Sequence, residues 1–191
     1  MRAYRNGHLV YIPIYKNAAT SYEILFGKIL NWEIILTETI DWDNDTVFAH
    51  ITHPYTRHLK GTIQFLYQHN LTSVIDDPRF NRFLISGYFD HHSYPLTQMF
   101  GDKVWKINWL PLDHPTISGD TITCCFLNKQ GVEISEHLIP YKNIGGLAKK
   151  SLLDRIKILC EENDHTNDGL FFLLDDDLRL YNHVLNNLNN N

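Results

Sequence analysis

The sequence has no surplus of positive charge. Its 191 residues include 17 Lys and Arg against 22 Asp and Glu, so the formal net charge is -5 at pH 7. Proteins that coat nucleic acid neutralise the phosphate backbone with many basic side chains. We therefore expect no nucleic-acid partner, and any anion site on this chain must be local.

Cysteines and long apolar runs are also scarce. The three cysteines, Cys124, Cys125 and Cys160, form neither a C-x-x-C metal pattern nor an even disulfide framework, which favours a reducing compartment. No apolar stretch approaches the length of a signal segment or a membrane span. We expect a cytoplasmic protein without a membrane span, folded as a single domain over residues 1–191.

The sequence also lacks the Gly-x-x-x-x-Gly-Lys-Ser/Thr loop of P-loop kinases. Its one Gly-Lys pair, Gly27-Lys28, is followed by Ile29 inside a helical pattern. No Asp suited to Mg²⁺ follows a predicted strand, which counts further against a kinase. The histidines His50, His53 and His58 have no Cys or carboxylate partners at a standard spacing, so we predict no metal site.

Strand patterns alternate with helix patterns along most of the chain, which predicts an α/β fold. Runs of β-branched and aromatic residues predict strands, and apolar residues at helical spacing predict helices. The predicted strands cover residues 8–14, 46–51, 103–109 and 121–127. The predicted helices cover residues 19–30, 55–69, 78–86, 148–160 and 169–188.

The segment of residues 16–21 lies between a predicted strand and a predicted helix. At such a junction, backbone N–H groups and the positive end of the helix dipole converge on an anion. Lys16 adds a point charge, and the hydroxyls of Thr20 and Ser21 add donors. Small residues at Ala18 and Ala19 let the backbone approach a ligand closely. The segment predicts a phosphate site that needs no metal.

A second segment of the same kind follows about 30 residues later. The strand predicted at 46–51 runs into Thr52, and a helix begins near Pro54. Arg57 and Lys60 stand on the first turns of that helix, close enough in sequence to share one face. This segment predicts a second site for a phosphate dianion.

The first segment resembles the 5′-phosphosulfate loop of sulfotransferases, usually written P-K-x-G-T-T-S. Lys16, Thr20 and Ser21 match it, whereas Tyr15 and Ala18 stand at the positions of the Pro and the Gly. The order of the two segments strengthens the resemblance.

The second segment resembles the 3′-phosphate segment of the same family, R-D-P-x-x-R-x-x-S. Pro54 and Arg57 match, whereas Thr52, His53 and Lys60 replace the first Arg, the Asp and the Ser. Lys60 restores at the helix the charge that Thr52 lacks, without the bidentate geometry of a guanidinium.

The resemblance implies a three-layer, P-loop-like fold with a central, mainly parallel sheet flanked by helices. It implies a carbohydrate-type sulfotransferase that uses 3′-phosphoadenosine 5′-phosphosulfate and a hydroxyl acceptor, here a saccharide, without a metal. It also implies a general base, for which His92 in the 90–98 segment ranks first and Glu38 second. Donor binding is expected from Lys16, Asn17, Ala18, Ala19, Thr20, Ser21, Thr52, Arg57 and Lys60.

Two alternatives stay open at the level of sequence. One is a binding protein that keeps the fold and has lost the donor, because Thr52 replaces the family's arginine. The other is a kinase that uses the same strand, loop and helix arrangement on ATP.

Overall fold

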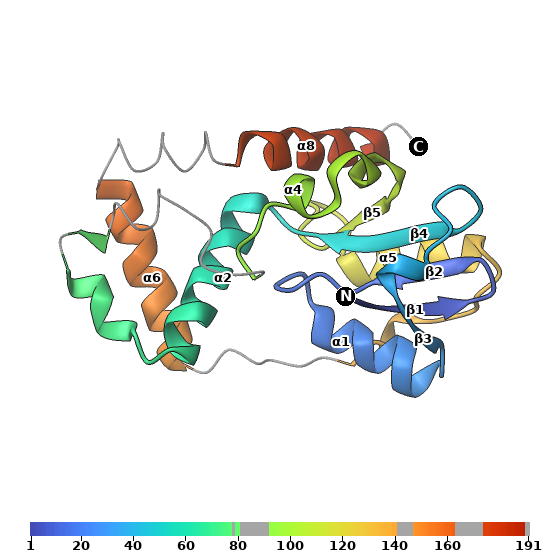
Figure 1. The fold of residues 1–191 in the computed structure, drawn as a ribbon, viewed down its shortest axis with the longest axis horizontal. Coiled ribbons are helices and arrows are strands. Elements are labelled where there is room, and N and C mark those ends of the chain that lie inside the picture. Colours follow the sequence, from blue (N-terminus) through green and yellow to red (C-terminus); the bar gives the residue numbers. More distant parts are fainter. Residues whose placement is uncertain (78, 81–91, 141–146, 163–173, 190–191) are drawn as a thin grey trace. The chain divides into compact units, whose positions relative to one another are not determined.

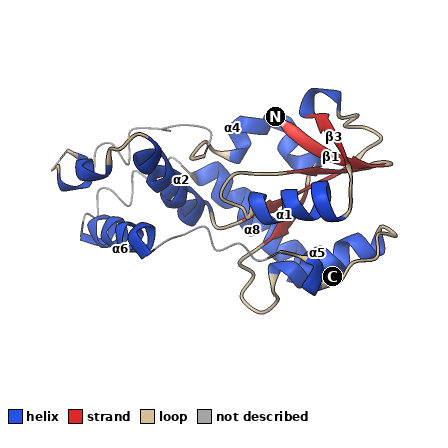
Figure 2. Ribbon diagram, turned by 90° about the horizontal axis from the view of Figure 1, so that it is seen from below, coloured by secondary structure: helices blue, strands red, loops and turns tan. Residues whose placement is uncertain are grey.

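The computed structural model describes residues 1–77, 79–80, 92–140, 147–162 and 174–189. Its contacts divide the chain into two compact units, each built from separated segments. Unit 1 comprises Met1–Thr52, Phe100–Lys142 and Tyr181–Asn191, and unit 2 comprises His53–Met99 and Asn143–Leu180. The strands are coloured red and the helices blue in Figure 2.

Unit 1 contains a five-stranded sheet in the order β3-β1-β2-β4-β5. The pairs β1–β2 and β1–β3 are antiparallel, and the pairs β2–β4 and β4–β5 are parallel. Four of the five strands therefore run in one direction, and β1 opposes them. The strands span Arg2–Asn6 (β1), Leu9–Ile12 (β2), Glu33–Leu36 (β3), Thr46–Ile51 (β4) and Asn108–Pro111 (β5).

The helices complete a mixed α/β fold. Unit 1 also contains α1 (Ala19–Ile24) with a π-helical continuation, η1 (Leu25–Ile29), and α5 (Gly119–Lys129). Short 3-10 turns are η2 (Thr37–Thr39), η3 (Thr72–Asp76), η4 (Gly101–Lys106) and η5 (Glu136–Leu138). The remaining described helices are α2 (Pro54–Gln68), α4 (Leu96–Phe100), α6 (Leu147–Glu162) and α8 (Asp175–Asn189).

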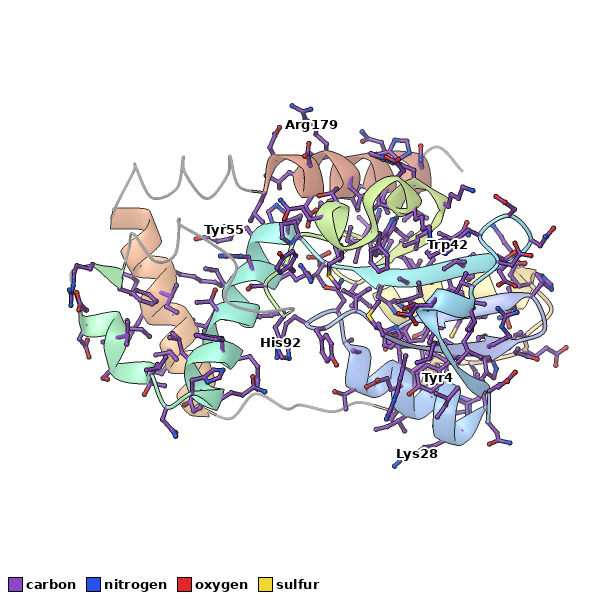
Figure 3. All side chains as sticks on the ribbon, viewed as in Figure 1. Tyr4, Lys28, Trp42, Tyr55, His92 and Arg179 are labelled. Atoms are coloured by element: carbon purple, nitrogen blue, oxygen red, sulfur yellow. The ribbon has the colours of Figure 1, made fainter. Side chains whose placement is uncertain are left out.

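The core of unit 1 is aromatic on the sheet face that α1 covers. Tyr11 on β2 packs its ring 4.4 Å from Phe26 and 5.4 Å from Phe48, centroid to centroid. Figure 1 shows α1 running alongside β1 and β2. Gly27 allows this approach, because a Cβ there would lie 2.7 Å from the ring of Tyr4, a residue labelled in Figure 3. Offset and tilted aromatic pairs of this kind stabilise a core beyond their buried area.

Unit 2 has its own apolar cluster, formed by α2, η3 and α6. The spacing of Leu59, Ile63 and Leu66 on α2 gives that helix one apolar stripe. Side chains of η3 and α6, including Ile75 and Ile156, pack against this stripe. An exposed ion pair between Arg155 and Asp76 joins the same two elements.

Most strand and helix predictions for the first third of the chain are confirmed. The strand predicted at 46–51 matches β4, and the helix predicted at 55–69 matches α2 within one residue at each end. The strand at 8–14 contains β2, and the helix at 19–30 becomes α1 followed by η1. Helices α6 and α8 are also confirmed where they are described, but most of the helix predicted at 78–86 lies outside the described residues.

Two strand predictions need correction. The strand predicted at 121–127 is wrong, because these residues form helix α5. The β-branched run of Thr121, Ile122 and Thr123 favours a strand locally. However, the Ser118 hydroxyl accepts the N–H of Thr121 at 3.0 Å and so begins a helix. The strand at 103–109 is wrong over most of its length, because η4 occupies 101–106 and β5 begins only at Asn108.

The close approach of α5 to the end of β5 gives a stability test. A Cβ at Gly119 would lie 2.8 Å from the Leu112 Cα and 2.8 Å from its Cδ2. We expect Gly119→Ala to lower the free energy of unfolding by about 1–3 kcal/mol, as overpacking does. Urea denaturation measures this, with Cys125→Ala, at an exposed position of the same helix, as the control. A gain in stability, which the higher helix propensity of Ala alone would give, contradicts the prediction.

Candidate functional site

The first predicted phosphate segment forms a tight turn between β2 and α1. Lys16 and Ala18 both adopt left-handed backbone conformations, with φ of 67° and 55°. Such conformations disfavour residues with a Cβ and cluster at functional sites. Ala18, which precedes the first residue of α1, takes this conformation at the position where the sulfotransferase loop that the sequence resembles has a glycine. The turn therefore has a backbone conformation that favours glycine, although alanine stands there.

Asn17 anchors this turn to the adjacent parallel strand. Its side chain is fully buried, and its Nδ2 donates to the carbonyl oxygen of His50 at 2.7 Å. The Thr52 hydroxyl donates to Asn17 Oδ1 at 2.8 Å. The Asn17 backbone N–H also bonds to the Ile14 carbonyl oxygen at 3.1 Å. The loop after β2 is thus fixed to the carboxyl end of β4.

Inward and outward residues alternate along the turn. Asn17 and Ala19 are buried, whereas Ala18 and Thr20 are exposed. Lys16 and Ser21 are half-buried. The residues that match the sulfotransferase loop, Lys16, Thr20 and Ser21, are exposed or half-buried. Asn17 instead forms its side-chain hydrogen bonds inside unit 1.

A buried polar network that sequence reasoning missed lies beneath the turn. The His50 ring stacks on Tyr22, with centroids 3.7 Å apart, and its Nε2 lies 2.9 Å from Thr123 Oγ1. The Tyr22 hydroxyl donates to Asp120 Oδ1 at 2.7 Å. The Thr123 hydroxyl donates to the Gly119 carbonyl oxygen, so it accepts from His50 Nε2–H, which assigns the tautomer. The other ring nitrogen then accepts from the Tyr11 hydroxyl at 3.3 Å.

His50 is neutral in the folded protein. Burial lowers the pKa of its imidazole from 6.5 to about 3, because the charged form loses its hydration. Burial is also the main cause that raises the pKa of the Tyr22 phenol. The one signal that could have found this network is a histidine near the end of an otherwise apolar strand, residues 46–51.

The second predicted segment begins α2, with Pro54 at its first turn. Lys60 is exposed, whereas Thr52 and Arg57 are buried, Arg57 to 2% exposure. Burial lowers the pKa of the Arg57 guanidinium to about 10, and the negative charge of Asp177 opposes this shift. Of the three residues predicted to bind the 3′-phosphate, Lys60 therefore presents its side chain to solvent and the other two point inward.

The two candidate bases lie in different surroundings. His92 is buried, at 8% exposure, and its backbone lies close to α2 at Gly61. Glu38 is exposed in η2 after the edge strand β3. The pKa of Glu38 is lowered by a hydrogen bond from its own backbone N–H and by the amino group of Met1. This environment does not provide the raised pKa that a carboxylate base needs.

The described residues contain neither a metal-binding cluster nor a helix suited to a membrane. No group of three or more His, Cys, Asp or Glu side chains within them is placed to hold a metal ion. Among the helices that the structure describes, none combines the length and the apolar character that spanning a membrane requires.

Comparisons with protein-family models, with curated proteins and with solved structures gave no match to this chain. Within unit 1 the structure joins Asn17 and Thr52, one residue from each predicted phosphate segment, in a direct hydrogen bond.

The anchoring role of Asn17 gives a second test. Asn17→Ala leaves the His50 carbonyl and the Thr52 hydroxyl buried without this partner, so we expect a loss of about 2–4 kcal/mol in the free energy of unfolding. Urea denaturation measures the loss. Thr20→Ala, at an exposed position three residues later, should change stability by less than about 0.5 kcal/mol. Equal losses of unfolding free energy in the two variants would show that the Asn17 hydrogen bonds do not stabilise the turn.

Proposed function

We propose that this protein is a sulfotransferase that moves the sulfuryl group of 3′-phosphoadenosine 5′-phosphosulfate to a hydroxyl, on a saccharide acceptor. The observation that carries the proposal is the anchored turn after β2. Lys16 and Ala18 have left-handed backbone at a strand end, Ala18 is exposed, and turns of this kind form anion-binding concavities. The three residues that match the sulfotransferase loop lie on this turn or immediately after it. The proposal includes a three-layer, P-loop-like fold and a cytoplasmic location.

The proposed reaction is an in-line displacement at sulfur. The acceptor oxygen forms a bond to sulfur while the bond from sulfur to the bridging phosphate oxygen breaks. The electron pair of that bond stays on the leaving phosphate, which the Lys16 ammonium stabilises. His92 takes the proton of the acceptor hydroxyl, because imidazole is suited to proton transfer near neutral pH.

The residues that bind the donor are fewer in this proposal than the sequence suggested. Lys16, Thr20 and Ser21, with the backbone at Ala18 and Ala19, hold the 5′-phosphosulfate. Lys60 holds the 3′-phosphate. The reaction needs no metal, because a sulfuryl group carries less charge than a phosphoryl group, so positioning and fixed charges suffice.

Nucleotide binding tests the donor assignment directly. We expect 3′,5′-bisphosphoadenosine to raise the Tm, since a ligand that binds only the folded state stabilises it by mass action. ATP, with and without Mg²⁺, should have a smaller effect. Lys16→Ala should lower turnover by about 100-fold or more with the fold unchanged by circular dichroism. No Tm shift at millimolar bisphosphate would refute the donor, and a larger shift with Mg·ATP would favour a kinase.

Lys60→Ala tests whether the charge of the 3′-phosphate site has moved from the strand end to the helix. We expect affinity for the 3′-phosphorylated nucleotide to fall by about 1.5–3 kcal/mol, the usual strength of a hydrogen bond to a charged group. Affinity for adenosine 5′-phosphosulfate should be nearly unchanged. Isothermal titration calorimetry with both nucleotides measures the difference. Equal losses on both would mean that Lys60 does not recognise the 3′-phosphate.

A further inference from the structure

The segment of residues 92–97, which contains the candidate base, is held by side chains and backbone of unit 2. The first contact comes from Arg57 on α2. Its Nη1 donates to the Tyr94 carbonyl oxygen at 2.5 Å, and its Nη2 lies 3.8 Å from Met99 Sδ. Its Nε has no hydrogen-bond partner among the described residues. A buried guanidinium used in this way orders the loop backbone that it contacts.

The second contact is a close approach of the same helix. A Cβ at Gly61 would lie 2.5 Å from the His92 carbonyl oxygen and 2.9 Å from the Ser93 nitrogen. Real Cβ atoms do not approach backbone so closely, so only glycine fits at this position without a shift of the loop. Gly61 stands four residues after Arg57, which places both contacts on one face of α2.

The third contact comes from Asp177, in the first turn of α8. One of its carboxylate oxygens accepts from the Leu96 backbone N–H at 2.8 Å. The other accepts from the Thr97 backbone N–H at 2.9 Å and from the Thr97 hydroxyl at 2.8 Å. Asp177 is 1% exposed and so caps the beginning of α4 from the interior.

The charges of Arg57 and Asp177 are opposite, and each makes burial of the other less unfavourable. Each is almost fully buried, and an isolated buried charge is strongly unfavourable. The attraction of the Asp177 carboxylate favours the cationic form of Arg57. No direct ion pair joins these two described side chains, and each instead forms hydrogen bonds with the backbone of the 92–97 segment, Arg57 at Tyr94 and Asp177 at Leu96 and Thr97.

We propose that Arg57 is a positioning residue which, with Gly61 and Asp177, clamps the segment of residues 92–97 and thereby places the His92 imidazole. This inference rests on the proposed function, in which His92 takes the acceptor proton. In this inference Arg57 positions the general base and does not bind the nucleotide. Arg57 is thereby connected to the segment that carries the base through its hydrogen bond to the Tyr94 carbonyl oxygen.

The test compares Arg57→Met, which removes the hydrogen bonds and keeps an apolar stem, with Arg57→Lys and with Arg79→Met. Arg79 is an exposed arginine of the same unit, so its variant is the matched control. We expect Arg57→Met to lower kcat by about tenfold to a hundredfold and to change the Kd for 3′,5′-bisphosphoadenosine by less than about threefold. Arg57→Lys, which cannot reproduce the fork of donors, should recover only part of kcat.

A readout without substrate separates this inference from the proposed function. The NMR titration midpoint of the His92 imidazole should shift by about half a pH unit or more in Arg57→Met, because its surroundings change, and stay constant in Arg79→Met. A shifted midpoint supports the clamp even if the wild-type protein neither binds the bisphosphate nor transfers sulfate. An unchanged midpoint, together with a bisphosphate Kd weakened tenfold or more, would make Arg57 a nucleotide ligand and overturn the clamp.

Asp177→Asn provides a second variant in case Arg57→Met does not fold. The amide keeps the shape of the side chain and weakens its acceptor oxygens, so amide exchange at Leu96 and Thr97 should accelerate by about tenfold. The His92 midpoint should shift with it. Exchange rates and a midpoint equal to those of the wild type would overturn the clamp.

Discussion

The buried amide of Asn17 is the interaction on which the carboxyl edge of the unit 1 sheet depends. Left-handed backbone at Lys16 and Ala18 costs about 1–2 kcal/mol per residue. The two side-chain hydrogen bonds of Asn17 each contribute about 1 kcal/mol, and leaving their buried partners unpaired would cost more. The backbone cost and the contribution of these hydrogen bonds are therefore of similar size. The turn keeps its left-handed conformation because Asn17 ties it to the interior of unit 1. The His50 carbonyl oxygen on β4 accepts one of these bonds. The neutral imidazole of the same residue stacks on Tyr22, which helps to hold β4 in place.

The cationic side chains of the two predicted phosphate segments differ in what they can do. Arg57 is buried, and its charge is balanced inside unit 2 by Asp177, which leaves little of it for a ligand. Lys16 is half-buried and Lys60 is exposed. Flexible ammonium groups neutralise the charge of a bound dianion. They select its orientation less strictly than the rigid, bidentate donors of a guanidinium do. The proposed donor site therefore relies on backbone shape at the turn for its selectivity.

The sequence predicted the elements whose local signals agree with their final environment. The apolar run of β4 and the Pro54 start of α2 are examples, because each segment is buried along the stripe that its pattern indicates. Strands β1 and β3 were missed, since charged residues such as Arg5 and Glu33 interrupt them and they lie toward an exposed edge. Helix α5 was missed because its β-branched run resembles a strand until the Ser118 cap is considered. Pattern alone could not decide whether Asn17 binds a ligand or the backbone, because both roles need a hydrogen-bonding side chain at a strand end.

Thr52 stands where the sulfotransferase segment that the sequence resembles has an arginine, and in this fold it has a structural role. Thr52 is 6% exposed, and its hydroxyl donates to Asn17, the residue that anchors the turn. An arginine here would need to bury a larger, charged side chain or turn it outward, and the substitution would remove the hydroxyl that donates to the side-chain amide oxygen of Asn17. Thr52 thus anchors the turn at the position where the sulfotransferase segment that the sequence resembles has a phosphate ligand. If the 3′-phosphate is bound, the positive charge must come from a residue outside this pair, and Lys60 is the exposed cation on the helix that follows.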